Sequence, residues 1–361
     1  MKEQENFPFL GNKKRYEMWE KEPVEVVSSI DGAEKELGVS LPESLQKVEG
    51  KEITPEKSID IDNRALQNKD CPNIVFGRPH GGEYIPSELW KNLSEDGKKT
   101  LPIIDRGTSE IFKSENISSV GTKISRFVVD PNRPPLPGIK MSKSKAPGEV
   151  LWKKSLSGAD MFDEGAAPSS DEIRNLSEKF YLPYYNAMMA TIGSLADRRE
   201  SNQERVLIID GHSFPISEDK DFEPIWEHYE ITPEELKKLP LFIIGDMEGG
   251  SCDTDIVGAF SDSLEKNFNE LTDEEKNLLL ENSETKELIG KNKPFKGARN
   301  VEFFGQRKEG INSFQLELNE SAFVDEDGSY YDSEYNMKKI KIMKKLIEKT
   351  CLDIDPILKG K

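Results

Sequence analysis

The sequence predicts one α/β domain with a mixed, mostly parallel sheet and helices on both faces of that sheet. From residue 71 onward, short apolar runs alternate with segments of helical periodicity. Polar residues suited to catalysis or ligand binding follow several of these runs. In open α/β sheets, ligands bind beyond the carboxyl ends of the strands, so we expect these polar residues to form one site.

Residues 1–70 lack this alternation and predict a small helical N-terminal appendage with a linker, followed by the main domain over residues 71–361. Apolar residues mark one helical face at Val26, Val27, Ile30, Ala33 and Leu37. Gly38 closes that helix, and Ser40 with Glu43 resembles a capping box that opens a second short helix. Residues 51–70 are polar, with little periodicity, and indicate a linker or surface strap.

In the main domain, strands are expected over residues 74–77, 102–105, 124–129, 206–210, 241–245 and 314–319. Helices are expected from the capping box at Ser169 past a kink at Pro183, over residues 256–268, within 272–290, and from about 333 to 351. The segment that follows Pro135 and runs to about Gly148 is rich in proline, lysine and serine. It is interpreted as a flexible loop and a candidate lid.

The composition narrows the classes of partner. The 361 residues carry 68 acidic against 50 basic side chains, a formal net charge of -18. This balance argues against sequence-independent nucleic-acid binding and against attraction to anionic membranes, because both need a basic surface. An acidic small substrate would have to be attracted by a local cluster of positive charge.

We expect a cytoplasmic protein. The charged N-terminus has no apolar signal region, and no apolar run is long enough to span a bilayer. The three cysteines, Cys71, Cys252 and Cys351, are far apart and odd in number, which indicates reduced thiols and not a disulfide framework.

A divalent metal site is predicted from the histidines, of which the chain has three. His80 and Glu83 form a His-x-x-Glu spacing in the loop after an apolar run, and His212 follows a second apolar run with the same layout. A catalytic zinc takes three protein ligands and leaves one position for water, so His80, Glu83 and His212 are the predicted ligand set. The alternative interpretation is that each histidine caps a strand and bonds the backbone.

Glu317 is the predicted general base. It faces the same way as Gln315 on a strand whose other face carries leucines, so its carboxylate is expected to be partly desolvated. A polar sheet face without a catalytic role explains the same pattern equally well.

Arginines in or beside these motifs suggest recognition of a substrate carboxylate, because the guanidinium group binds carboxylates through two hydrogen bonds. Arg133, beside Asn132, is the leading candidate, and Arg78 and Arg299 are further ones. The competing interpretation is that some of these arginines pair with acidic neighbours such as Asp105 and Asp130.

Taken together and in order, these motifs resemble the N-formylglutamate amidohydrolase family. The matching segments are residues 79–86 (PHGGEYIP), 129–134 (VDPNRP), 209–215 (IDGHSFP), 244–246 (IGD) and 314–319 (FQLELN). They cover roughly the region from Cys71 to Asp325.

The resemblance implies a phosphorylase/hydrolase-like three-layer α/β/α fold related to zinc carboxypeptidases and aspartoacylases. It implies that His80, Glu83 and His212 bind Zn²⁺ or another divalent metal, that Asn132 and Arg133 bind the substrate carboxylate, and that Glu317 is the base. The implied reaction converts N-formyl-L-glutamate and water to formate and L-glutamate. A carboxypeptidase-like hydrolase of a peptide or cell-wall fragment, and a non-catalytic metal- or ligand-binding protein, are the alternatives.

Two segments depart from the family pattern. Members often have Tyr-x-Pro-Tyr-His in the central helix, whereas this chain has Tyr185 in place of the histidine. Members often have a Gly-Gly segment before the last strand, whereas this chain reads KGARN at residues 296–300.

Overall fold

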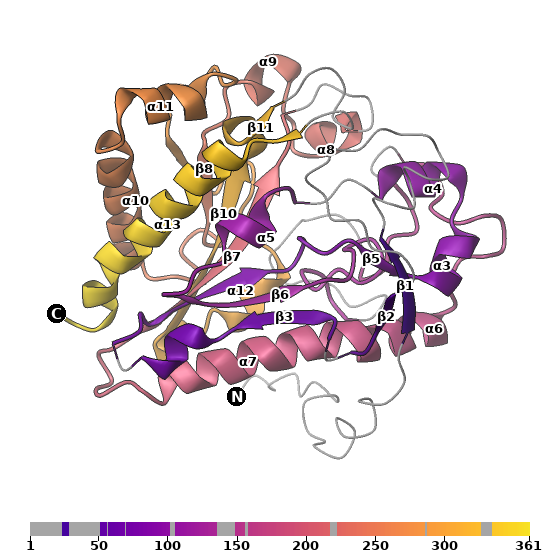
Figure 1. The fold of residues 1–361 in the computed structure, drawn as a ribbon, viewed down its shortest axis with the longest axis horizontal. Helices are drawn as coiled ribbons and strands as arrows, with labels where there is room; N and C mark the ends of the chain where they lie inside the picture. Colours follow the sequence, from indigo (N-terminus) through magenta and orange to yellow (C-terminus); the bar gives the residue numbers. More distant parts are fainter. Residues whose placement is uncertain are drawn as a thin grey trace.

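The computed structural model describes residues 24–28 and 51–361, apart from residues 56, 69, 102–104, 136–148, 156–157, 217–221, 286 and 326–333. Its centre is a seven-stranded sheet with the spatial order β3-β6-β4-β7-β10-β8-β9 (Figure 1). In that order the strands are Ile59–Asp62, Ser118–Thr122, Ile74–Arg78, Val206–Phe214, Ile311–Asn319, Phe242–Gly245 and Ile289–Lys291. The four strands β6, β4, β7 and β10 are parallel, whereas β3 and β8 run antiparallel to their inner neighbours.

Helices cover both faces of this sheet, which confirms the predicted α/β class. On one face, α6 (Ser170–Leu176), a π-helical turn η2 (Ser177–Tyr181) and α7 (Leu182–Ala196) form one long helix that runs along β3, and α12 (Arg299–Phe304) packs on β7 and β10 (Figure 1). The capping box at Ser169 begins this long helix as predicted.

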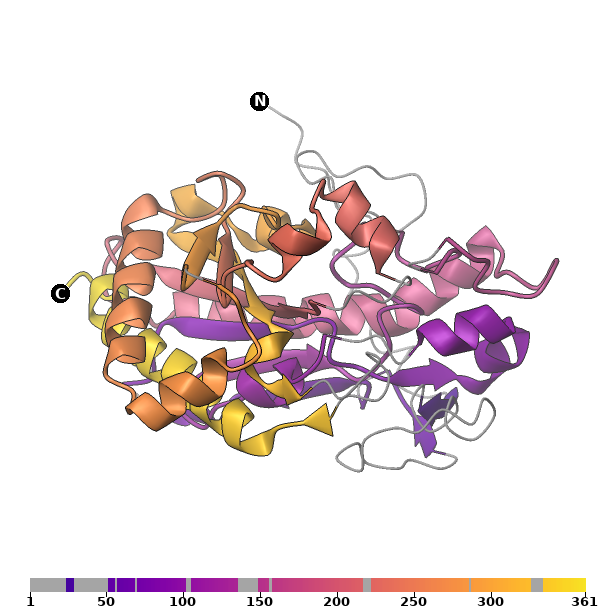
Figure 2. The ribbon, with the colours of Figure 1, turned by 90° about the horizontal axis from the view of Figure 1, so that it is seen from above.

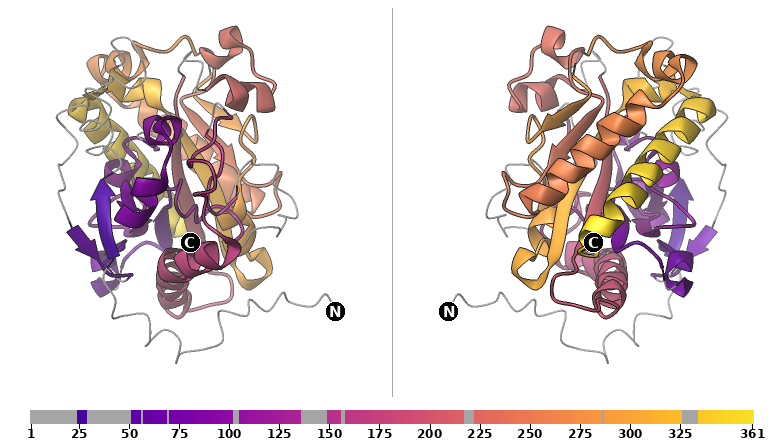
Figure 3. Two further views of the ribbon diagram at one scale, coloured as in Figure 1. Left: turned by 90° about the vertical axis from the view of Figure 1, so that its right-hand side faces the viewer. Right: turned by 90° about the vertical axis from the view of Figure 1, so that its left-hand side faces the viewer.

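The opposite face is covered by α5 (Thr108–Ile111), α10 (Thr254–Asn269), α11 (Asp273–Leu280) and α13 (Met337–Leu358). Figure 3 shows α10 and α13 side by side. None of the helices in the described part of the chain is both long and apolar enough to cross a membrane.

Short elements complete the chain. They are β1 (Val24–Ser28), β2 (Lys51–Ile53), η1 (Arg64–Gln67), β5 (Tyr84–Pro86), α3 (Ser87–Asn92), α4 (Glu95–Thr100), α8 (Glu223–His228), α9 (Pro233–Leu236), η3 (Arg307–Glu309), η4 (Glu320–Ala322), β11 (Val324–Asp325) and β12 (Glu334–Tyr335). The strands β1, β2 and β5 form a small sheet at the end of the molecule away from α10 and α13 (Figure 2).

Strand periodicity divides the core into two layers. In β4, Ile74 and Phe76 pack toward α10 and α13, whereas Val75 packs toward α7. The same alternation in β10 buries Leu316 and Leu318 on the α10 side and turns Gln315 and Glu317 to the side of α7 and α12. The sheet therefore presents polar catalytic candidates on one face while the other face is mainly apolar.

The N-terminal region differs from its prediction. Val26 and Val27 lie in strand β1 and not in a helix, because a run of β-branched residues favours an extended chain. The rest of the predicted helical region, residues 29–50, lies outside the described residues. Residues 51–70 are more than a linker, since β3 is the edge strand of the central sheet and pairs with β6. The sheet thus begins before the predicted boundary at residue 71.

One further region differs from expectation, and two predictions cannot be compared with the described residues. Residues 124–129 form buried turns, and the strand of this region is β6, whose sequence SSVGT is too polar to be recognised as a buried strand. The strand predicted at 102–105 and the candidate lid up to Gly148 fall on residues 102–104 and 136–148, which lie outside the described residues.

We predict that Leu316→Ala lowers the free energy of unfolding by about 2–5 kcal/mol, because Leu316 is fully buried in β10 and truncation leaves a cavity. Leu352→Ala is the matched control, since Leu352 is 41% exposed and its truncation should change stability by about 0.5 kcal/mol or less. Urea unfolding measures both, and equal losses would contradict this assignment of the core.

Candidate metal centre and active site

Two buried histidines meet at the carboxyl ends of the central parallel strands. His80 follows β4, and His212 lies within β7, where it is paired with Glu317 of β10. Their ring centroids are 4.6 Å apart, and each side chain is 2% exposed. The structure therefore brings together the two histidines that the sequence singled out.

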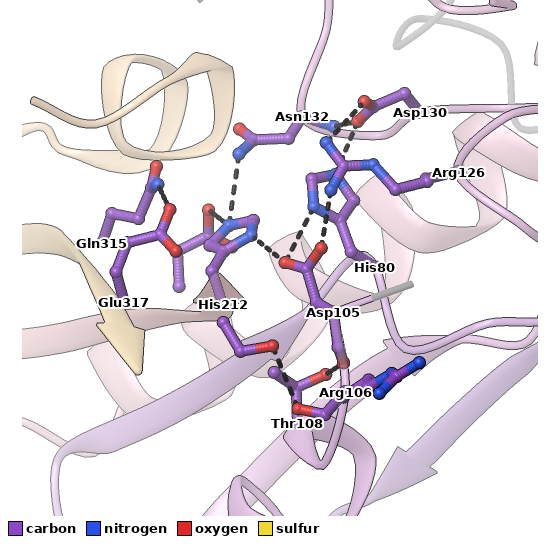
Figure 4. A network of polar contacts seen from close by, with 12 residues as sticks. His80, Asp105, Arg106, Thr108, Arg126, Asp130, Asn132, His212, Gln315 and Glu317 are labelled. Carbon is purple, nitrogen blue, oxygen red and sulfur yellow. Dashed lines mark hydrogen bonds and ion pairs between the residues drawn. The ribbon is translucent and has the colours of Figure 1, made fainter. Parts of the chain in front are cut away.

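Asp105 lies between the two imidazoles (Figure 4). Its Oδ2 atom is 3.2 Å from Nδ1 of His80 and 2.8 Å from Nδ1 of His212. Its Oδ1 atom accepts a 2.6 Å hydrogen bond from Arg126. One carboxylate oxygen thus faces both rings, while the other is held by a guanidinium group.

The outer nitrogens of both rings contact other carboxylates. Nε2 of His80 is 2.7 Å from Oδ1 of Asp130, and Nε2 of His212 is 2.9 Å from Oδ2 of Asp210. Both carboxylates are fully buried. Metal-binding histidines commonly donate their second ring N–H to a carboxylate, which leaves the first nitrogen free for the ion.

His80, Asp105 and His212 could hold a divalent ion, because each offers one ligand atom and these atoms lie within 4.8 Å of one another. Imidazole nitrogen and carboxylate oxygen are the ligands of catalytic zinc sites. The donor set and the carboxylates behind both rings fit such an ion.

Neighbouring charges in this cluster shift the pKa values of His212 and Asp105. Burial would lower the pKa of His212, but Asp210 and Asp105 outweigh this effect and raise it to about 10. Burial would raise the pKa of Asp105, yet His80, Arg126 and His212 together hold it well below its usual range. Without an ion, the two imidazoles and Arg126 therefore stabilise the buried carboxylates in charged form.

Glu317 lies beside His212, together with Gln315 (Figure 4). Gln315 donates a hydrogen bond from Nε2 to Oε1 of Glu317. Burial raises the pKa of Glu317 to about 8, and the nearby Asp105 adds to this rise, while His212, Gln315 and Arg126 oppose it. A carboxyl group with a pKa near neutrality can both accept and release a proton.

Asn132 presents its amide N–H₂ to the same cluster. Its Oδ1 atom accepts a 2.9 Å hydrogen bond from the backbone N–H of Asn300, which fixes the orientation of the amide. Its Nδ2 atom lies 3.2 Å from Nε2 of His212, but a proton on Nε2 is directed to Asp210. The amide hydrogens therefore have no acceptor at that nitrogen and can donate to an oxygen of a ligand.

The predicted arginines occupy different places. Arg133 is buried beside this cluster, where it donates to the carbonyl of Asn132 at 2.9 Å and lies 3.9 Å from Asp130. Arg299 begins α12 and lies 5.2 Å from the ring centroid of Phe303. The guanidinium group of Arg78 instead bonds Asp60 at 2.9 Å and the carbonyl of Ser109 at 3.2 Å, which ties β4 to the edge strand β3.

Glu83, the third predicted ligand, lies half-buried in the loop between β4 and β5 and is not a member of the His80, Asp105 and His212 group. The sequence analysis did not single out Asp105 as a candidate ligand, nor Asp130 and Asp210 as partners of the histidines. Asp130 and Asp210 stand within the motifs VDPNRP and IDGHSFP, and Asp105 follows the apolar residues 103–104. The sequence feature that could have identified them is the aspartate at the end of each of these three apolar segments.

The fold and the site define an α/β protein with a buried centre of histidines and carboxylates. The family model described as N-formylglutamate amidohydrolase matches residues 73–324, so the chain belongs to this family.

Relatives in two species support this placement. The chain is 25% identical over 256 residues to N-formylglutamate deformylase of Pseudomonas putida, covering 70% of this chain and 82% of that protein. It is 23% identical over 260 residues to the protein of the same name in Pseudomonas aeruginosa, covering 71% and 84%. The crystal structure of an N-formylglutamate amidohydrolase from Ralstonia eutropha JMP134 matches with a TM-score of 0.57 at 18% identity, covering 84% of this chain and 99% of that one. The structural match shows the same fold.

A second buried acid, Glu320, connects the loop of Asp105 to β7. Its Oε1 atom accepts hydrogen bonds from the backbone N–H of Arg106 at 3.2 Å and from the hydroxyl of Ser213 at 2.8 Å. Burial raises its pKa to about 7, although Arg106 and Ser213 oppose the rise. The protonated form of Glu320 is therefore favoured in the folded chain relative to the unfolded one.

We predict that Glu320 makes the fold less stable as the pH rises from about 4.5 to about 7. An acid whose pKa is raised by folding stabilises the fold below its unfolded pKa, and this contribution is lost as the pH rises through the folded pKa. The loss is up to about 3 kcal/mol, since one pKa unit corresponds to about 1.4 kcal/mol.

Glu320→Gln keeps an oxygen acceptor but does not titrate, so its free energy of unfolding should fall less over this range than that of the wild type. Urea unfolding of both proteins at a series of pH values isolates this difference, because all other acids are shared. Parallel pH profiles would contradict the prediction.

Proposed function

We propose that this chain is a metal-dependent amidohydrolase that converts N-formyl-L-glutamate and water to formate and L-glutamate. The observation that carries the proposal is the pair of imidazoles whose Nδ1 atoms face Asp105 while their Nε2 atoms are held by Asp130 and Asp210. The names of the Pseudomonas relatives support the choice of substrate.

His80, His212 and Asp105 are the proposed ligands, with zinc as the leading ion and other divalent ions accepted by the same donors. A divalent ion in this position supplies an acidified water and polarises an amide carbonyl. Asp130 and Asp210 fix the ring orientation, because each accepts the outer N–H of one histidine. Arg126 holds Asp105 from the other side.

Glu317 is the proposed general base. Its carboxylate takes a proton from the attacking water and delivers it to the nitrogen of the breaking C–N bond, so that formate and the free amine leave. Burial raises its pKa to about 8, which suits a group that must both take up and release a proton. The hydrogen bond from Gln315 holds the carboxylate in place.

Asn132 and Arg133 are proposed to bind the substrate carboxylate. Arg299 is a further candidate cationic group, since it precedes Asn300, whose backbone N–H bonds Asn132. The amide of Asn132 is oriented to donate, and a guanidinium group matches a carboxylate with paired hydrogen bonds. Local positive charge is required because the whole chain has a formal net charge of -18.

The direct test is release of formate and amine from a panel of N-formyl and N-acetyl amino acids by zinc-loaded protein, with and without a chelator. We expect turnover that the chelator abolishes and that is fastest with N-formyl-L-glutamate. Turnover that resists the chelator would contradict the metal mechanism, and a preference for longer peptides would contradict the substrate.

Glu317→Gln should reduce kcat at least about 100-fold while zinc remains bound, because the change removes the proton acceptor and preserves the shape of the side chain. Gln306→Ala is the control, because Gln306 is exposed beside η3 and its replacement should leave kcat unchanged. Gln315→Glu is unsuitable, since it adds a charge. A rate of Glu317→Gln within a few-fold of the wild type would refute the role.

Asp105→Asn and Glu83→Gln together decide the third ligand. If Asp105 binds the ion, Asp105→Asn weakens zinc binding about 100-fold or more, whereas Glu83→Gln changes it by less than about tenfold. Competition with a chromogenic chelator measures both dissociation constants. The reverse order would restore Glu83 as the ligand.

A further inference from the structure

Asn300, the second residue of α12, connects Asp210 and Asn132, two groups that have separate roles in the proposed reaction. The side chain is 1% exposed. Its Nδ2 atom donates to Oδ1 of Asp210 at 2.9 Å, and its backbone N–H donates to Oδ1 of Asn132 at 2.9 Å. Its Oδ1 atom lies 3.0 Å from the hydroxyl of Tyr185. Asn300 was not among the site residues predicted from the sequence.

The amide of Asn300 has one possible orientation, and the hydroxyl proton of Tyr185 is shared between Oδ1 of Asn300 and the carbonyl of Pro131. Asn300 must donate to Asp210 through its amide nitrogen, so the opposite end of the amide is the oxygen that accepts from Tyr185. The second oxygen of Asp210 is then free to accept the Nε2–H of His212. A continuous chain of donors and acceptors therefore runs from Tyr185 through Asn300 and Asp210 to His212.

Close packing around Asp210 restricts the groups in this series of hydrogen bonds. A Cβ atom at residue 77, a glycine in the neighbouring strand β4, would lie 3.0 Å from Oδ1 of Asp210. The ring of Tyr185 stacks on Tyr181 at a centroid distance of 4.5 Å, and its hydroxyl is also 3.1 Å from the carbonyl of Pro131. Asn300 is thus held between α7 and the loop that carries Asn132.

We infer that Asn300 is a positioning residue for the metal centre, and that Tyr185 holds it in place. Through Asp210 it fixes the tautomer and ring orientation of His212, and through its backbone N–H it turns the amide of Asn132 toward the ligand. The inference rests on the proposed metal chemistry but not on the identity of the substrate.

The test compares Asn300→Leu with Asn267→Leu. Leucine has nearly the shape of asparagine but neither donates nor accepts. Asn267 is a matched control, because it is 2% exposed and donates from Nδ2 to Asp353 at 3.0 Å between α10 and α13, on the opposite face of the sheet. Both variants lose one buried amide that bonds an aspartate, but Asp210 is buried whereas Asp353 is exposed, so Asn300→Leu should lose more stability in urea unfolding.

The two variants should separate in zinc binding. Asn300→Leu should raise the zinc dissociation constant about 10- to 100-fold, the range seen when partners of metal-binding histidines are removed, while Asn267→Leu leaves it unchanged. The cobalt-substituted protein gives a second readout, since a shift of its visible absorption bands in Asn300→Leu alone reports altered ligand geometry. Equal zinc affinities and spectra in the two variants would overturn the inference.

A milder pair of variants guards against misfolding of Asn300→Leu. Tyr185→Phe removes the hydroxyl that bonds Asn300, whereas Tyr184→Phe removes a buried hydroxyl for which the described residues provide no hydrogen-bond partner. Tyr185→Phe should weaken zinc binding about 2- to 10-fold, the effect of losing one hydrogen bond, and Tyr184→Phe should not. An effect of the same size in both would overturn the role of Tyr185.

These outcomes are distinct from failure of the proposed function. If wild-type protein binds zinc but does not hydrolyse N-formyl-L-glutamate, the substrate proposal fails while the comparison of zinc affinities still decides the role of Asn300. If turnover occurs and the affinities of Asn300→Leu and Asn267→Leu agree, the function stands and the positioning role fails.

Discussion

The site depends on compensation of negative charge in a water-excluded space. Asp105, Asp130 and Asp210 are each 4% exposed or less, and an isolated ionised carboxylate is very costly to bury. Their oxygens are bonded by two imidazoles, the guanidinium group of Arg126, the amide of Asn300, the backbone N–H of Asn132 and the indole N–H of Trp152. A bound cation would add to this compensation, and His80, Asp105 and His212 offer the ligand atoms that could hold it.

The sheet topology makes this clustering possible. β4 and β7 are adjacent and parallel, and β7 and β10 are adjacent and parallel, so His80, His212 and Glu317 reach the same edge from three strands. On the other face, an apolar layer under α10 and α13 anchors the same strands. The positions of the catalytic candidates are therefore set by the strands that carry them, and α12 packs on β7 and β10 beside these candidates.

The sequence predicted the parts of this arrangement that follow from strand periodicity. Apolar runs identified β4, β7 and β8, and the alternation of apolar and polar residues identified β10 and the direction in which Glu317 points. Contacts between residues far apart in the chain could not be predicted, because no local pattern reports that Asp105 lies between His80 and His212 or that Asn300 bonds Asp210. Likewise, β6 is buried although its sequence is polar, and Arg78 is engaged by Asp60 of a strand that was interpreted as part of a linker.

The central claim is that one divalent ion binds between the two histidines and Asp105. The most direct measurement is a crystal structure of zinc-loaded protein with anomalous diffraction recorded on both sides of the zinc edge. The account predicts one anomalous peak per chain, in contact with Nδ1 of His80, Nδ1 of His212 and a carboxylate oxygen of Asp105. A peak elsewhere, or stoichiometric zinc bound through the Nε2 atoms with Asp130 and Asp210 displaced, would contradict it.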